Sequence, residues 1–486
     1  MILGIGLLTS AYGSFLAMPT GIRSTNQGGL LMIRTISLIL VASIIFEIST
    51  LLHLPDNSIC VFMDGTIKLS AQITYLLIFI QTIAIIILQF GVEGGTGAQL
   101  SRISGEVFLV MLVNLVALIY VLVGIDWLVT VVAWELFNLS LYLLVSMQRP
   151  AGSKEISLSA SVKYFLLSAY TTSFLLLSIA LLYGLTGTTS YDGLIMIVQT
   201  GEVSLWPFYL MMLTFLFKLG AAPLHGWAPD LYDSLPTYTT MFLLIVPKSA
   251  VLFLLLQLDY VIGSEYGYNL LLVVGAISMI VGSLGLSSQW RIKRFLAYSS
   301  IANLGFILVT INHAPSYYFY IIVYMVSTLV IFGIILSISS GHNIEYISDL
   351  SGLYSRNPAL AYALAICFFS LAGTPPLIGF FPKLVVILNL LEQGYFAILA
   401  ILVISSILSC CNYLSVIFTI HLGKDCYKET IVISYRNAII ISAGVGLLML
   451  PIGLYNLVDV LCYFNHESML IIAAIPLMTP VKSCKL

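Results

Sequence analysis

A small set of ionisable side chains lies inside long apolar segments of the sequence. They are Glu47, Glu135, Lys218, Lys248 and Lys383, with Lys163 nearer the end of its segment. A charge in the middle of a bilayer costs on the order of 3 kcal/mol or more. Burial disfavours the charged form and a partner of opposite charge favours it, so such a group can change protonation when its partner moves. A proton relay needs groups whose protonation can change in this way.

Four of these residues can be ordered along a proton path. Glu135 and Lys218 are expected at similar depth, where they could form a buried pair whose opening frees a proton. Lys248 and Lys383 would continue the path. Alternatively, a buried Glu–Lys pair only fixes helix packing.

Three further residues are open to two interpretations each. His225 could extend a hydrogen-bonded water chain or be an ordinary packing residue. Lys163 could join the path or only extend its ammonium to the membrane surface. Glu47 has no obvious partner within the membrane, which favours an incidental position.

The composition places these residues in a membrane protein. Only 8% of the 486 residues are charged and 60% are hydrophobic, whereas soluble chains carry about 25% charged residues. This excludes a soluble enzyme, a disordered tail and a nucleic-acid-binding domain. The sequence predicts an all-α polytopic fold of about fourteen transmembrane helices. The predicted spans are 2–18, 32–54, 70–90, 105–122, 127–147, 158–184, 204–226, 236–258, 268–286, 295–312, 317–338, 358–388, 396–421 and 437–459, with 468–478 expected at the surface.

The loops predict the orientation. Counted from the N-terminus, the even loops contain Lys68 alone among Lys and Arg, together with most of the loop Asp and Glu. By the positive-inside rule, the odd loops face the matrix or cytoplasm. Those odd loops hold Arg23, Arg34, Arg102, Arg149, Lys154, Arg291, Lys293, Arg294, Arg356, Lys424, Lys428 and Arg436.

Two expected helices, 204–226 and 358–388, contain Gly and Pro deep inside. Proline breaks a helix, and freed backbone groups inside a membrane must be satisfied by protein or water. The two helices lie five apart, an odd offset that reverses direction, which is typical of an inverted repeat. The alternative is two unrelated proline kinks. The predicted domains are 1–103 (helices one to three), 104–260 (first five-helix repeat), 261–425 (second, inverted repeat) and 426–486 (last helix and tail).

Other motifs predict no redox centre. The seven cysteines have no ligand spacing, so no metal site or bound cofactor is expected. The glycine-rich segment 91–97 follows a helix rather than a strand and is expected to be a loop. No removable targeting segment is expected, because the chain opens directly on an apolar run.

Several segments together resemble a known family, the N-type antiporter-like membrane subunits of respiratory NADH:ubiquinone oxidoreductase (complex I). The segments are 134–142, 162–167, 182–187, 217–230, 247–248, 292–300 and 375–383. The resemblance covers about residues 104–420.

This resemblance implies fourteen helices with two inverted five-helix repeats and a role in proton translocation coupled to quinone reduction. It assigns proton translocation to Glu135, Lys218, Lys248 and Lys383, with Lys163 as a further family lysine. It also implies an enzyme complex, the H⁺-translocating NADH:ubiquinone reductase, in which NADH, FMN, iron–sulfur clusters and ubiquinone act on other subunits. Two positions depart from the family: Asn303 stands where histidine is frequent, and Pro382 where glycine is common.

The expected partners are other membrane subunits of complex I, notably neighbouring antiporter-like chains, and lipids, with no nucleic acid. The apolar start and the high Ile, Leu and Tyr content favour the mitochondrial inner membrane over a bacterial plasma membrane or a thylakoid. The alternatives are a subunit of a cation/proton antiporter, of a membrane hydrogenase or of the plastid NDH complex, a passive scaffold subunit, and a solute permease.

Overall fold

The computed structural model of the chain describes residues 25–53, 60–62, 66–93, 105–147, 154–199, 205–263, 266–339, 344–423 and 433–450. Within these ranges, ten helices are long and apolar enough to cross a membrane, and three shorter apolar helices accompany them. The chain is therefore a multi-pass helical membrane protein, as the sequence predicts. The expected span 2–18 and the segment 468–478 lie outside the described residues, so the count of fourteen helices stays a prediction.

The described chain divides into two compact units. The first contains the described part of Met1–Phe215 with Val246–Gly263, and the second contains the described part of Ser264–Ile472 with Leu216–Ile245. Two helices, α8 (Trp206–Leu219) and α10 (Thr237–Ile262), contribute residues to both. The four domains expected from the repeat pattern stay a prediction.

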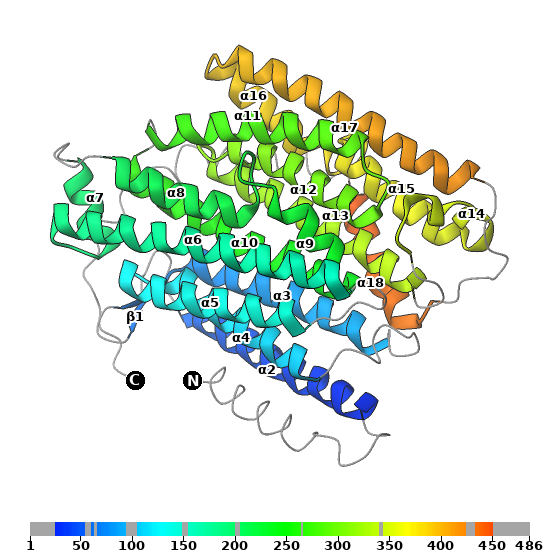
Figure 1. The fold of residues 1–486 in the computed structure, drawn as a ribbon, viewed down its shortest axis with the longest axis horizontal. Coiled ribbons are helices and arrows are strands. Elements are labelled where there is room, and N and C mark those ends of the chain that lie inside the picture. Colours follow the sequence, from blue (N-terminus) through cyan, green and yellow to red (C-terminus); the bar gives the residue numbers. More distant parts are fainter. Residues whose placement is uncertain are drawn as a thin grey trace. The chain divides into compact units, whose positions relative to one another are not determined.

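The first unit is built from apolar helices and one short hairpin. Its helices α2 to α5 pack on one another and are drawn from blue to cyan in Figure 1. The hairpin and the short helix α7 were not predicted, because they form in short loops without a long apolar run. The elements are α2 (Thr25–His53), β1 (Cys60–Phe62), β2 (Ile67–Leu69), α3 (Ala71–Glu93), α4 (Gly105–Val123), α5 (Trp127–Met147), α6 (Lys154–Thr186) and α7 (Tyr191–Gln199).

In the second unit, the long expected helix 358–388 is two helices in succession, and α8 is likewise followed by the separate helix α9. Helix α11 packs along α12 and also against α17 (Figure 1). The elements are α9 (Trp227–Ser234), α11 (Tyr266–Ser287), α12 (Ile292–Val309), α13 (Ala314–Ser339), η3 (Ile347–Leu350), α14 (Leu353–Arg356), α15 (Pro358–Ala372), α16 (Phe380–Glu392), α17 (Phe396–Leu422) and α18 (Tyr435–Leu448).

Small residues allow α11 and α12 to approach closely. A Cβ atom added at Gly282 of α11 would lie 2.4 Å from the backbone nitrogen of Ala302 in α12. Membrane helices gain little from the hydrophobic effect against one another, so close backbone packing at small residues holds them together. Gly282 is therefore a structural requirement of this helix pair.

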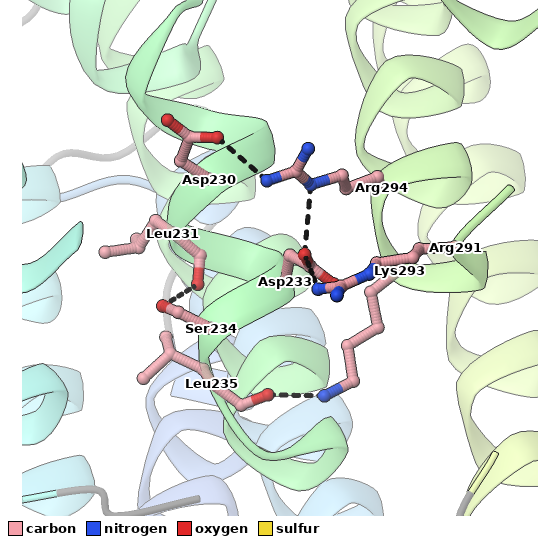
Figure 2. Close-up of polar contacts among 8 residues, drawn as sticks. All are labelled: Asp230, Leu231, Asp233, Ser234, Leu235, Arg291, Lys293 and Arg294. Atoms are coloured by element: carbon pink, nitrogen blue, oxygen red, sulfur yellow. Dashed lines mark hydrogen bonds and ion pairs between the residues drawn. The ribbon is translucent and has the colours of Figure 1, made fainter. Parts of the chain in front are cut away.

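Charged residues fasten the end of α9 to the start of α12 (Figure 2). One carboxylate oxygen of Asp233 accepts hydrogen bonds from Arg291 Nη1 at 2.7 Å and from Arg294 Nε at 3.0 Å. Arg294 also reaches Asp230 at 3.2 Å, and Lys293 Nζ donates to the Leu235 carbonyl at 2.5 Å. The Asp233 carboxylate raises the pKa of the Arg291 guanidinium, so this contact stays charged at neutral pH.

Replacement of the shared carboxylate tests this tether. Asp233→Asn should destabilise the assembled protein by about 1–2 kcal/mol, because the Asp233 side chain is only 8% exposed while its two arginines remain partly solvated. Asp230→Asn is the matched control, since Asp230 is 41% exposed and its contact with Arg294 is longer, at 3.2 Å. The midpoint of heat inactivation measures both, and equal shifts would contradict the assignment.

A pair of glycine substitutions tests the helix contact. Gly282→Ala should cost about 1–3 kcal/mol by overpacking, because the added methyl group meets backbone atoms that cannot rotate away. Gly184→Ala, in helix α6, adds the same methyl group where nothing lies within 4 Å. The yield and thermal stability of the folded chain should fall for Gly282→Ala only. Tolerance of both would refute the close approach.

Candidate functional site

Helix α8 ends directly beside a lysine of the predicted path. Gly220 adopts the left-handed conformation (φ 73°). Its amide donates to the Phe217 carbonyl at 2.9 Å, and the Ala221 amide donates to the Leu216 carbonyl at 3.0 Å. These two bonds form a Schellman ending, which glycine permits without steric cost. Lys218 lies in the last turn of α8 and is 7% exposed.

Helix α15 ends in the same way. Gly373 is left-handed (φ 81°), its amide donates to the Ser370 carbonyl at 3.0 Å, and the Thr374 amide donates to the Phe369 carbonyl at 3.2 Å. Both breaks that the sequence predicts are therefore confirmed as complete helix ends. Each half-helix presents its carbonyl end, which carries partial negative charge, inside an apolar segment.

Lys383 satisfies the backbone carbonyls that are left open at the end of α15. Its Nζ donates to the carbonyls of Leu371 at 2.7 Å and Ala372 at 2.9 Å. It also lies 5.2 Å from the ring centroid of Phe306, a cation–π distance. The neighbouring Pro382 occupies the first turn of α16, where a missing amide hydrogen costs no helical bond. The lysine thus caps the preceding half-helix from the following one.

Asn303, the position that departs from the family, lies near this lysine. Its Nδ2 donates to the Ser299 carbonyl at 2.9 Å, and its Oδ1 accepts from the Tyr320 hydroxyl at 3.3 Å. Asn303, Tyr320 and Lys383 line one cavity, which has room for roughly one water molecule. Because an amide does not titrate, Asn303 can orient a donor or a water but cannot store a proton.

Glu135 and Lys248 belong to the first unit. Glu135 lies half-buried in α5, beside Trp134, whose ring packs on Phe215 at 5.0 Å. Lys248 is 2% exposed and directly follows Pro247, which stands inside helix α10. Lys218 belongs to the second unit, and the Glu135–Lys218 pair stays a prediction.

The two further candidates differ in position. Lys163 is exposed on α6. His225 follows the break after α8, is half-buried and faces the ring of Tyr298 at 6.3 Å between centroids. Its buried Nδ1 has no hydrogen-bond partner among the described residues. His225 therefore has a free ring nitrogen for a water molecule, whereas Lys163 is placed at the surface of this chain.

Asn138 and Asn114 were not predicted as part of the site. Asn138 stands three residues after Glu135, on the same helix face. It is fully buried, and neither atom of its amide has a hydrogen-bond partner in the described part of the chain. Asn114 of α4 donates to Ser140 at 2.8 Å and leaves its Oδ1 without a partner there. The signal in the sequence that could indicate them is an asparagine inside a long apolar helix.

Comparison with known proteins assigns the chain to a family. A family model described as "NADH:quinone oxidoreductase/Mrp antiporter, TM" matches residues 124–409. The chain is 33% identical over 403 residues to NADH-quinone oxidoreductase subunit N of Nitrosomonas europaea, covering 79% of this chain and 81% of the relative. It is 37% identical over 307 residues to NADH-ubiquinone oxidoreductase chain 2 of Rhizopus oryzae, covering 59% of this chain and 58% of that one.

A solved structure supports the fold. A chain of respiratory complex I from Thermus thermophilus superposes with a TM-score of 0.75 at 24% identity, over 98% of both chains. The match extends beyond the segments that carry the family motifs, to the N-terminal helices. The chain therefore belongs to the transmembrane family of NADH:quinone oxidoreductase and Mrp antiporter subunits.

Proposed function

We propose that this chain is the antiporter-like membrane subunit of a proton-pumping NADH:quinone oxidoreductase. The two relatives described above carry the names of such subunits. The observation that carries the proposal is the placement of a buried lysine at the carbonyl end of each broken helix: Lys218 in the last turn of α8, and Lys383 on the open carbonyls of α15.

This placement sets two opposing effects on each ammonium group. The carbonyl end of a half-helix favours a positive charge. Burial among apolar side chains disfavours it. A small movement of the helix end relative to the lysine changes the balance, so the group takes up a proton in one state and releases it in the other. A fixed Coulomb contact within a rigid helix could not be switched in this way.

The proposed path follows the four predicted residues in order. Opening of the Glu135–Lys218 pair releases a proton toward Lys248, and Lys383 passes it on. Near Lys383, Asn303 and Tyr320 hold one wall of the small cavity, in which a water molecule can accept the proton. His225 offers its unbonded Nδ1 to a water chain near the first break.

Under this proposal, the redox reactions of the enzyme take place in other subunits. NADH, FMN, iron–sulfur clusters and ubiquinone act on other subunits, and this chain binds no cofactor. Its partners are the other membrane subunits, notably neighbouring antiporter-like chains, and lipids. The similarity to the Rhizopus oryzae chain and the high Ile, Leu and Tyr content favour the mitochondrial inner membrane.

A passive scaffold is the competing function, and the bonds that Lys383 makes with two carbonyls favour it, because they also fix helix packing. The scaffold requires these charges for assembly only. The pumping function requires them during turnover as well. Measurements on the assembled complex separate the two.

Substitution of Lys218 tests the proposal. In assembled complex in sealed vesicles, Lys218→Met should lower the proton-pumping rate by about tenfold or more, because methionine keeps the side-chain volume and loses the proton carrier. A pH-sensitive dye reports pumping while NADH oxidation is followed in the same sample. Lys68→Met, in the β2 strand of the hairpin, is the matched control and should pump normally. Normal pumping by assembled Lys218→Met would leave only the scaffold role.

A further inference from the structure

Glu47 lies outside the part of the chain that the family model matches, and the path above does not use it. It stands six residues before the end of α2 and is 9% exposed. Its Oε1 accepts a hydrogen bond from Gln81 Nε2 of α3 at 2.6 Å. Gln81 is fully buried and lies at the middle of the span Ala71–Gly91. The carboxyl group is therefore held inside the membrane by a residue of the neighbouring helix.

The hydrogen bonds in this cluster run in one direction. The single hydroxyl hydrogen of Ser43 can be donated to Gln81 Oε1 at 2.7 Å or to the Leu40 carbonyl at 2.8 Å, and Gln81 donates in turn to Glu47. The second carboxyl oxygen of Glu47, Oε2, is buried and has no hydrogen-bond partner among the described residues. One neutral donor thus serves a group that, when ionised, needs several donors or a cation.

No described cation stabilises an ionised Glu47. The ion pairs within the described ranges involve other residues. Arg34, on the same helix, is exposed and thirteen residues away. The segment 2–18 contains no Lys, Arg or His. A buried carboxylate without a cation is costly, whereas a neutral carboxylic acid loses only one hydrogen bond.

The described titratable side chains on the helices packed against α2 are exposed. Helix α2 packs on α3 and α4. Tyr75 of α3 is 64% exposed and Tyr120 of α4 is 40% exposed. Glu106 at the start of α4 is exposed as well. These three side chains are therefore at the surface of this chain, whereas Glu47 is buried.

We propose that Glu47, held by Gln81 and Ser43, is an exchangeable proton-binding site in the N-terminal helices, separate from the lysine path of the repeats. At rest it holds a proton on the carboxyl group, and Oε2 is the atom that gives it up or receives it. Loss of that proton leaves a carboxylate, and the proton passes to water. The site binds one proton and needs no other cofactor.

Infrared difference spectroscopy of the assembled complex tests this site. The unsubstituted protein should show a carbonyl stretching band of a protonated carboxylic acid that is missing in Glu47→Gln, which mimics the neutral acid in shape. Glu106→Gln removes an exposed carboxyl group at a helix start and should leave that band in place. A spectrum of Glu47→Gln that keeps the band would overturn the proposal, because Glu47 would then be ionised at rest.

Three further measurements need no change at Glu47. In D₂O the band should shift, and it should lose intensity as the pH is raised while the complex remains intact. A band that neither exchanges with deuterium nor responds to pH would make Glu47 a fixed packing acid and contradict the proposal. Gln81→Leu should move the band to higher frequency, because Oε1 loses its donor, and an unmoved band would refute the Gln81 contact. None of these outcomes depends on Lys218.

Discussion

The ammonium group of Lys383 and the carbonyls at the end of α15 depend on each other. Inside a membrane, every backbone polar group must find a partner within the protein or in trapped water. The Schellman ending at Gly373 satisfies the carbonyls of Phe369 and Ser370, and Lys383 satisfies those of Leu371 and Ala372. The helix can end within the bilayer because the lysine is there, and the lysine is tolerated because the helix ends.

Helix α8 ends in the same way as α15, but a tryptophan instead of a lysine donates to one of its last carbonyls. The Phe217 carbonyl accepts from the Gly220 amide and also from the indole nitrogen of Trp227 at 3.0 Å. Beyond this break, the short helix α9 is tied to α12 through Asp233. Side chains from beyond each break, Trp227 and Lys383, therefore donate to carbonyls of the helix that ends there.

Much of this fold could be predicted from the sequence, because a long apolar run in a membrane chain must form a helix to satisfy its backbone hydrogen bonds. The span 127–147 agrees with α5 at both ends, and the breaks were located from Gly220, Pro223, Gly373 and the Pro375–Pro376 pair. The hairpin β1–β2 and helix α7 could not be predicted, since tertiary contacts rather than local pattern stabilise such short loop elements.

The site was less predictable than the fold. The sequence identified the lysines as buried charges, and the structure confirms burial for Lys218, Lys248 and Lys383. It could not indicate that Lys383 bonds backwards to α15, because that contact depends on the path of the chain after the break. Glu47 was expected to lack a partner, whereas the structure supplies Gln81, thirty-four residues away. Contacts between helices of this kind leave no periodic signal in the sequence.

The most direct test of the account separates the capping role of Lys383 from its charge. Lys383→Gln retains an amide donor for the open carbonyls and loses the group that can carry a proton. The quantity to measure is the number of protons translocated per NADH oxidised by the assembled complex in sealed vesicles. If Lys383 carries protons, the substituted complex should assemble and give a lower ratio than the unsubstituted protein. An unchanged ratio would contradict the claim that a lysine at a broken helix end carries protons.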